Sequence, residues 1–379
     1  MPGPGAPVHN ARVTAPPFDP LSHLREPADT PAVEPEADVL LYGTVFLDLV
    51  LTGIDGGVTP GTEVWASGMG SSPGGIANLA VATSRLGLRT TLAAAFGDDA
   101  YGDFCWRTLE EQEGVALTRS RRYPDWHTPV TVSLAVDGDR SMISHGHPSP
   151  EPASALIGDP PRTRIALLDL HADDLSWTTK ARQQGALLFA DAGWDATGEW
   201  STDLLDRLDG IHAFTPNAVE AMAYTRSRTP HEAMYALADR VPLVVVTNGA
   251  EGALAIDSST GEEEHVPALH VEAVDATGAG DVFHAAIALG TLAGWPLRDR
   301  LAFATLCSGL AVQHVGGSLA APGWGDIVDW WRRVKADPSG SARCASVRRR
   351  FAFLDEIVPD VPQDAVRRAQ ATIARQSDV

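Results

Sequence analysis

Hydrophobic residues follow two alternating patterns in the body of this chain. The run "DVLLYGTVFLDLVL", residues 38–51, is continuously apolar and rich in β-favouring residues, which predicts a strand buried on both faces. "NLAVATSRLG", residues 78–87, has helical spacing and ends at Gly87, a natural position for a helix C-terminus. The pattern then returns to a strand at 89–97 and to a helix at 101–114.

The same alternation continues toward the C-terminus. Strands are expected at 164–170, 185–193, 243–249 and 252–257, with a helix at 201–210 among them. Strands that alternate with helices indicate an α/β fold with a mostly parallel sheet covered on both faces.

Two stretches have a different, extended character, at about 52–70 and 127–147. The second contains "PVTVSLAVDGDRSMISHG", in which Asp137-Gly138 separates two alternating arms, a strong hairpin signal. We expect these stretches to form a small antiparallel sheet beside the main one.

The ends of the chain differ from its middle. Residues 1–36 are rich in Pro, Ala and Gly and lack apolar periodicity, which predicts a disordered lead-in before a main domain at 37–335. Residues 336–379 are mildly basic with mixed charges, which favours a segment packed on the domain over a nucleic-acid-binding arm. Two short helices are expected there, at 348–358 and 362–376.

Composition narrows the possible functions of the 379-residue chain. A formal net charge of −20 disfavours nucleic acid as a partner. The sequence contains no apolar run of membrane-spanning length and no signal-peptide pattern, so we expect no membrane partner. Cys105, Cys307 and Cys344 are an odd number without metal-ligand spacing, which indicates a reducing cytoplasm. The lysines are Lys180 and Lys335, and neither follows a glycine, so a Walker A loop is excluded.

Candidate chemistry begins at Gly278-Ala279-Gly280-Asp281, just before an apolar, alanine-rich run that predicts a helix. A helix N-terminus presents unpaired N–H groups and partial positive charge, so these amides could hold a phosphoryl group. The Asp281 carboxylate could then accept a proton from an attacking hydroxyl. The residues alone are equally compatible with Asp281 as a helix cap.

A second glycine turn lies at Gly74-Gly75, followed by Asn78. Glycine permits close approach of a ligand to the backbone, and an Asn side chain can donate and accept hydrogen bonds to polyol hydroxyls. A simple turn and helix cap is the structural alternative.

Together these stretches resemble the signatures of the PfkB, or ribokinase-like, family of sugar and nucleoside kinases. The first signature is matched by Gly74, Gly75, Asn78, Ala80, Gly87 and Gly97, followed by "GDDAYG". The second is matched in full by Asp275, Thr277, Gly278, Ala279, Gly280 and Asp281. Ile76 departs from the pattern, because Gly, Ala or Pro is usual there, and it is expected to affect the turn ahead of Asn78. The resemblance covers about residues 37–331.

The resemblance implies a ribokinase-like three-layer sandwich whose small antiparallel sheet is a lid over the substrate and often a dimer surface. It implies that the phosphoryl acceptor is held by Asp48, Gly74, Gly75 and Asn78, and that ATP is lined by Thr247, Gly249, Gly252, Ser308 and Gly316. Asn217 and Glu220 would organise Mg²⁺, often through water. Asp275 and Thr277 could face a monovalent cation such as K⁺ or serve only as structural caps.

Other polar and aromatic residues are weaker candidates. His127, His145 and His147 do not form an evident full ligand set, and an interpretation as lid or surface residues is favoured. Trp65 and Trp126 could stack on a sugar or base, or could simply pack.

The resulting hypothesis is an ATP-dependent kinase that phosphorylates a hydroxyl of a small sugar or sugar derivative. Asp281 would act as base, and the amides of Gly278–Asp281 would hold the developing charge. A nucleoside kinase of the same fold is the alternative, and a catalytically silent ligand-binding homologue comes third. The substrate itself depends on lid side chains that the sequence does not place.

Overall fold

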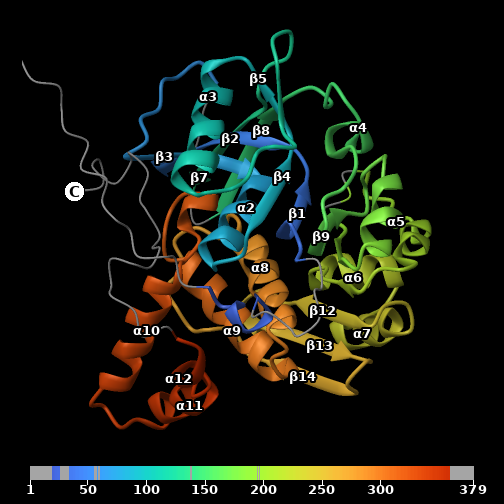
Figure 1. Ribbon diagram of the computed structural model, residues 1–379. Helices are drawn as coiled ribbons and strands as arrows, with labels where there is room; N and C mark the ends of the chain where they lie inside the picture. The colour runs from blue at the N-terminus through green and yellow to red at the C-terminus, as the bar shows by residue number, and fades with distance from the viewer. Residues whose placement is uncertain are drawn as a thin grey trace, which may run out of the picture.

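The main sheet of the protein has eight strands in the order β14-β13-β12-β11-β10-β9-β1-β4 (Figure 1). The computed structural model describes residues 19–25, 34–54, 58, 60–136, 139–193, 195 and 197–358. The strands are β1 (Ala37–Tyr42), β4 (Thr90–Ala93), β9 (Thr163–Asp169), β10 (Leu187–Asp191), β11 (Ala213–Phe214), β12 (Leu243–Thr247), β13 (Ala253–Asp257) and β14 (Glu262–Val266). All neighbours from β4 to β12 are parallel, whereas β13 and β14 continue the sheet antiparallel.

Helices cover both faces of this sheet because successive strand residues point to opposite sides. Val39 and Leu41 of β1 belong to a core with α2 (Ile76–Arg85), α8 (Ala279–Leu292) and α9 (Leu297–Ala311). Leu40, between them, belongs to a second core with α5 (Ser176–Gln183), α6 (Ala218–Thr225) and α7 (Pro230–Ala238). The expected three-layer α/β sandwich is therefore confirmed.

A second sheet, called the lid sheet below, has the order β3-β2-β7-β8. It consists of β2 (Val45–Ile54), β3 (Gly68–Gly75), β7 (Val130–Val136) and β8 (Asp139–His145). Its two outer pairs are antiparallel and its central pair, β2 with β7, is parallel. The Asp137-Gly138 turn expected between β7 and β8 lies outside the described residues, although Val136 and Asp139 on either side of it are paired.

The prediction of one continuous strand at 38–51 is wrong. The chain leaves the main sheet after Tyr42 and enters the lid sheet at Val45. Gly43 lies at this crossing, where a Cβ atom would come within 2.8 Å of Ile76 Cβ. Continuous hydrophobicity did not reveal the break, because both strands are largely buried.

Other predicted elements are divided in two or take a different helical form in the structure. The strand expected at 89–97 becomes β4 and β5 (Ala95–Gly97), and β5 pairs with β6 (Arg121–Tyr123). The helix expected at 101–114 is α3 (Ala100–Arg107) followed by a π-helical turn, and the one at 201–210 is a 3₁₀ helix. A short helix, α4 (Ala153–Ile157), follows the lid.

Part of the N-terminal segment expected to be disordered is ordered. Residues 19–25 include helix α1 (Ser22–Arg25), and Leu21 is fully buried in the core because its side chain packs on the domain. Residues 1–18 and 26–33 lie outside the described part of the chain.

Helix α10 (Trp324–Ala336) ends the main domain expected at 37–335, and the C-terminal segment adds α11 (Ala342–Arg350) and α12 (Leu354–Ile357) beside it, in orange-red at the lower left of Figure 1. Phe351 is fully buried, and its ring lies 4.9 Å from that of Trp330 between centroids. The second helix expected there, at 362–376, falls outside the described residues. No helix in the described part of the chain is long and apolar enough to cross a membrane.

Candidate active site

Asp281 is the third residue of α8, directly after the glycine turn. Gly278 caps this helix in the left-handed conformation, with φ of 75°, which favours glycine. A Cβ on Gly280 would have no neighbour within 4 Å among the described residues, so this part of the molecule leaves open space at the helix N-terminus. The N–H of Ala279 donates to Ala276 O at 3.2 Å, and the N–H of Asp281 bonds to its own carboxylate, so the amide of Gly280 is the one best placed to receive an anion.

The Asp281 carboxylate has a raised pKa. Burial raises its pKa to about 6, and His284, Asp191 and a hydrogen bond from Asn78 modify this effect. Asp191 raises the pKa, whereas His284 and Asn78 lower it. A carboxylate with this pKa is mostly ionised at neutral pH, yet is more basic than an exposed aspartate.

Asn78 lies on α2 and brings the first glycine signature to Asp281. Its amide is hydrogen-bonded to the Asp281 carboxylate. Asn78 Oδ1 and Ser72 Oγ are buried and have no hydrogen-bond partner among the residues that the structure describes. Both atoms border Gly317, where a Cβ would come within 3.1 Å of Asn78 Oδ1 and 3.5 Å of Ser72 Oγ. Buried polar atoms of this kind indicate a polar ligand, because leaving them unpaired is costly.

Asp48 lies on β2 opposite Ser72 of β3. Gly74 makes room for it, since a Cβ at that position would overlap the carboxylate at 1.9 Å from Asp48 Oδ2. Burial, together with the charges of Asp275 and Asp281, raises the pKa of Asp48 to about 7. Asp48, Asn78 and Ser72 therefore form one polar region next to Asp281.

Gly75 belongs to the same turn and is tightly packed. It has φ of 61°, and a Cβ would approach Thr44 O to 2.4 Å. Ile76, the residue that departs from the family pattern, packs against Gly43. The larger side chain is thus accommodated at the crossing between β1 and β2, while Asn78 keeps its place.

Asp275 and Thr277 brace the loop before α8. Asp275 Oδ1 accepts hydrogen bonds from Thr277 N at 2.9 Å and Thr277 Oγ1 at 2.6 Å, and Asp275 Oδ2 accepts one from Gly316 N at 3.2 Å. These bonds join the loop to the turn that contains Gly316 and Gly317. They show a structural role for both residues.

The adjoining turn is fixed from the other side by a buried arginine. Arg85 donates to Leu319 O at 2.9 Å and Ala321 O at 2.6 Å, and pairs with Glu113 at 2.8 Å. Ser318 Oγ donates to Pro73 O at 2.5 Å, which connects this turn to the first glycine signature.

A cavity of about 340 Å³ opens on the other side of the α8 N-terminus. It brings together four residues predicted to line ATP, namely Thr247, Gly249, Gly252 and Ser308, with Ala279 and Gly280 of α8. Gly316, predicted for the same role, is not among the lining residues and contacts Asp275 instead. Its apolar walls come from residues that sequence reasoning did not single out, Leu269, Val271, Phe283 and Val312.

Asn217 and Glu220 form a reciprocal cap at the start of α6. Glu220 N donates to Asn217 Oδ1 at 3.0 Å, and Asn217 N donates to Glu220 Oε2 at 2.9 Å. Burial raises the pKa of Glu220, which is only 6% exposed, and the charge of Asp191 adds to this effect.

Asp191 was missed by the sequence reasoning. It ends β10, and its charge acts on both Glu220 and Asp281. Its position at the carboxyl end of a parallel strand was the available signal, because ligands bind at that edge of open α/β sheets. The oxygen donors of Asp191, Asn217 and Glu220 fit a hard cation such as Mg²⁺.

Comparison with known proteins identifies the family of this chain. The model of the pfkB family carbohydrate kinases matches residues 37–323. A nucleoside kinase from Methanothermobacter thermautotrophicus is 27% identical over 77% of this chain and 95% of its own length. A ribokinase from Lactococcus lactis is 25% identical over 75% of this chain and 93% of its own length.

Solved structures show the same fold. Arabidopsis thaliana ribokinase complexed with ribose and ATP superposes with a TM-score of 0.65 at 23% identity, over 77% of this chain and 98% of that one. Adenosine kinase from Sinorhizobium meliloti gives a TM-score of 0.63 at 19% identity, over 74% and 95% of the two chains. The chain belongs to the pfkB family of carbohydrate kinases. It is accordingly a phosphotransferase that uses ATP and a hydroxyl acceptor of the sugar or nucleoside class.

Proposed function

We propose that this kinase phosphorylates a hydroxyl of a small sugar or sugar derivative, with Asp281 as the general base. One observation carries the proposal. Asp281 stands between two differently built regions, because Asn78 from the polar region hydrogen-bonds to it and neighbouring Gly280 lines the 340 Å³ cavity. An acceptor hydroxyl and the terminal phosphate of ATP can therefore meet at one carboxylate.

Each side chain has a defined task in the proposed reaction. Asp48, Ser72 and Asn78 hold hydroxyls of the acceptor, and Asp281 takes the proton of the attacking one. The alcohol oxygen then bonds to phosphorus as the bond to ADP breaks. The Gly280 amide stabilises charge on the transferring group, as an oxyanion hole does.

Asp191, Asn217 and Glu220 are the residues proposed to hold Mg²⁺, directly or through water. When bound, the ion neutralises charge on the phosphates. Asp275 and Thr277 offer the oxygen atoms that a monovalent cation such as K⁺ requires, in addition to their structural hydrogen bonds.

A sugar is favoured over a nucleoside by the surroundings of the lid tryptophans. Trp65 is 81% exposed and is not positioned to stack on a buried base. The space between Trp126, Tyr42 and Gly43 holds only about 10 Å³, which is too small for a nucleobase. Asp48, Ser72 and Asn78, in contrast, are polar groups suited to hydroxyls.

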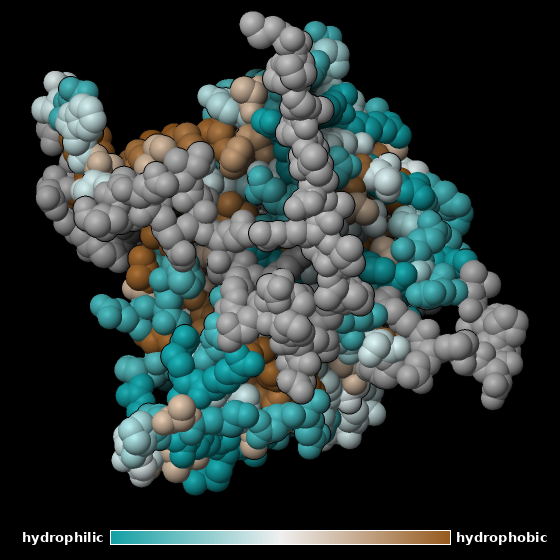
Figure 2. Space-filling view, turned by 60° about the vertical axis from the view of Figure 1, so that its left-hand side comes forward, coloured by the Kyte–Doolittle hydropathy of each residue, from teal (hydrophilic) through white to brown (hydrophobic). Residues whose placement is uncertain are grey.

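The lid sheet carries the proposed dimer surface. Met69 and Ile143 are 49% and 65% exposed although they are large and apolar, and the strand register places both on one face of the lid sheet. Figure 2 shows hydrophobic side chains gathered on the upper part of one face, where the lid sheet lies in the view of Figure 1. A second copy of the chain would bury them.

The three buried free thiols are suited to a reducing compartment such as the cytoplasm.

The base assignment is tested with Asp281→Asn. We expect turnover to fall by about 10²–10⁴-fold, because the amide cannot accept the proton, while ATP affinity stays close to wild type. Initial rates of ADP release and calorimetric ATP titration give the two quantities. Turnover within tenfold of wild type would remove Asp281 from this role.

The acceptor class is tested by a panel of pentoses, hexoses, their phosphates and nucleosides, each assayed for ADP release in the presence of Mg²⁺. We expect the highest kcat/KM with a sugar or sugar phosphate. A preference for nucleosides by at least tenfold would favour the second candidate and would overturn the sugar assignment. Asp281→Asn serves as the matched blank for contaminating ATPases.

A further inference from the structure

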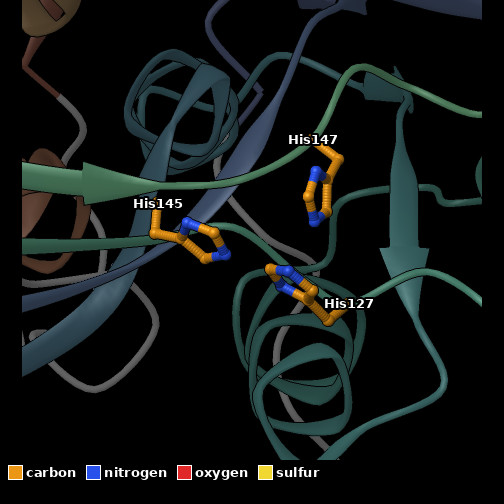
Figure 3. Close-up of side chains that lie close together, drawn as sticks. All are labelled: His127, His145 and His147. Atoms are coloured by element: carbon orange, nitrogen blue, oxygen red, sulfur yellow. The ribbon is translucent and has the colours of Figure 1, made fainter.

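Three histidines lie close together at the base of the lid hairpin. This is the end where β7 begins and β8 ends, away from the connection between the two strands. His127 precedes β7, His145 ends β8, and His147 follows two residues later (Figure 3). Their ring centroids lie 5.0, 5.0 and 5.4 Å apart. One nitrogen from each ring lies within 4.8 Å of the other two. The proposed phosphotransfer uses none of these groups.

Backbone pairing brings the two segments together. Val130 pairs with His145 at the start of β7, and Trp126 Nε1 donates to Pro148 O at 3.0 Å. Between these contacts, Gly146 packs so closely that a Cβ would meet Pro129 Cβ at 2.8 Å. The convergence therefore follows from the register of the hairpin.

The segment carrying His127 is also anchored to the main domain. The N–H of Thr128 donates to Asp99 Oδ2 at 2.8 Å, and Thr128 Oγ1 accepts a bond from Gly97 N at 3.0 Å. Thr128 itself is fully buried. The ring of His127 therefore projects from a fixed point toward the other two.

The ring nitrogens are available for coordination. His127 Nδ1 lies 3.2 Å from Thr128 O, so a proton on Nδ1 is held there and Nε2 is left to bind a metal. His145 and His147 are exposed, which provides an entry path for an ion. A tetrahedral ion bound at about 2.1 Å from each nitrogen needs them about 3.4 Å apart, so side-chain rotation closes the remaining gap.

We propose that His127, His145 and His147 bind a divalent transition-metal ion of the zinc type. Three imidazoles suit Zn²⁺, Co²⁺, Ni²⁺ or Cu²⁺ rather than Mg²⁺ or Ca²⁺, and water completes the fourth position. The bound ion joins the segment before β7 to the segment after β8 and so clamps the lid hairpin at its base. This site is independent of the phosphotransfer assignment, because it needs neither ATP nor an acceptor.

Binding is tested with Co²⁺, whose visible absorption reports imidazole coordination in a tetrahedral site. Chelator-treated full-length protein is titrated with Co²⁺ and then with competing Zn²⁺. We expect saturation at one equivalent per chain, displacement by Zn²⁺, and at least about tenfold weaker binding in each of His127→Gln, His145→Gln and His147→Gln. His231→Gln is the matched control, because His231 lies in an exposed pair with His265 elsewhere, 6.2 Å apart between centroids.

A second measurement keeps the proposal separate from effects on folding. We expect Zn²⁺ to raise the melting temperature of the wild type and of His231→Gln but not that of His145→Gln. His145→Gln without metal should melt like the wild type, because the side chain is exposed. Absence of saturable Co²⁺ binding, or an equal Zn²⁺ effect in His145→Gln, would overturn the metal site.

Discussion

Helices α2 and α8 begin alike, yet they serve the site in different ways. Each follows a glycine with positive φ, Gly75 at 61° and Gly278 at 75°, and each carries its functional side chain at the third position. Those side chains, Asn78 and Asp281, are hydrogen-bonded to each other. The surroundings of the two helix starts nevertheless differ.

The start of α2 is closed by packing, whereas that of α8 is open. A Cβ on the capping Gly75 would meet the backbone oxygen of Thr44 at 2.4 Å, whereas one on the capping Gly278 would come no closer than 3.4 Å to Asn78. One on Gly280, inside the first turn of α8, would meet no described atom within 4 Å. The first glycine turn therefore positions Asn78 in the polar region that we propose for the acceptor. The second leaves an N-terminus accessible to phosphate. The glycine turns before α2 and α8 are similar in sequence, yet different residues pack against them. We therefore propose different roles for the two turns.

The largest effect on stability is expected from Gly75→Ala. The change forces an alanine into a backbone conformation with φ of 61° and ψ of −131° and against Thr44 O, which should lower the free energy of unfolding by about 3 kcal/mol or more. Urea denaturation measures the loss. A change below about 1 kcal/mol would show that the α2 start is as open as that of α8.

Asp48→Asn should stabilise the protein at neutral and alkaline pH by on the order of 2 kcal/mol. Burial raises the pKa of Asp48 to about 7, so folding favours its protonated form. Its contribution to stability is present below the ordinary pKa of an aspartate and is lost as pH rises through about 7. The difference between variant and wild type should grow over this range and then level off.

Urea titrations of both proteins at several pH values measure this difference, and acceptor KM is expected to rise in the variant. A variant that is less stable than wild type above pH 7 would contradict the assigned burial of charge. An effect on ATP affinity with acceptor KM unchanged would place Asp48 on the wrong side of the site.

Asn78→Ala tests the bond between the two helix starts. Removing a hydrogen bond that lowers the pKa of Asp281 should raise that pKa, so the acid limb of kcat should move to higher pH by up to about one unit. The kcat profile is measured at saturating acceptor. An unmoved or downward-shifted limb would contradict coupling through this bond.

The smallest effect on stability is expected from Gly280→Ala. The free energy of unfolding should stay the same or rise by about 0.5–1 kcal/mol, because alanine favours a helix more than glycine does. The added methyl group would contact no described atom within 4 Å. The added methyl group lies beside the proposed phosphate position, so kcat/KM for ATP should nevertheless fall. Thermal unfolding and ATP-dependent rates distinguish the two consequences. Loss of stability comparable to that of Gly75→Ala would erase the contrast between the helices.

Much of the fold was predictable because its signals are local. Period-two and helical patterns located most strands and helices, and the glycine signatures located the starts of α2 and α8. The errors occurred where the chain changes partner without changing hydrophobicity, as at Gly43, where one apolar run serves two sheets. Leu21 is a similar case, because burial of one residue in a Pro-rich segment leaves no periodic signal.

The candidate site was predictable in part for the same reason. Thr247, Gly249, Gly252 and Ser308 do line one cavity, but its apolar wall comes from segments without a distinctive local pattern. Asp191 ends a strand that was predicted, yet its nearness to Glu220 and Asp281 depends on how separate segments pack. Gly316 was assigned to ATP, and its position beside Asp275 depends on how two distant loops pack.

By itself, the sequence determined the alternation of strands and helices, the two glycine turns and the polar residue three positions into each helix. These features depend on neighbouring residues, since φ values, caps and periodicity are set within a few positions of the chain. Only the tertiary structure decided that Gly74 makes room for Asp48 and that Asn78 reaches Asp281. It also decided that three histidines lie together at the base of the lid hairpin. These contacts join segments that are far apart in sequence. They depend on sheet register and helix packing, because many weak contacts together set the distances between such segments.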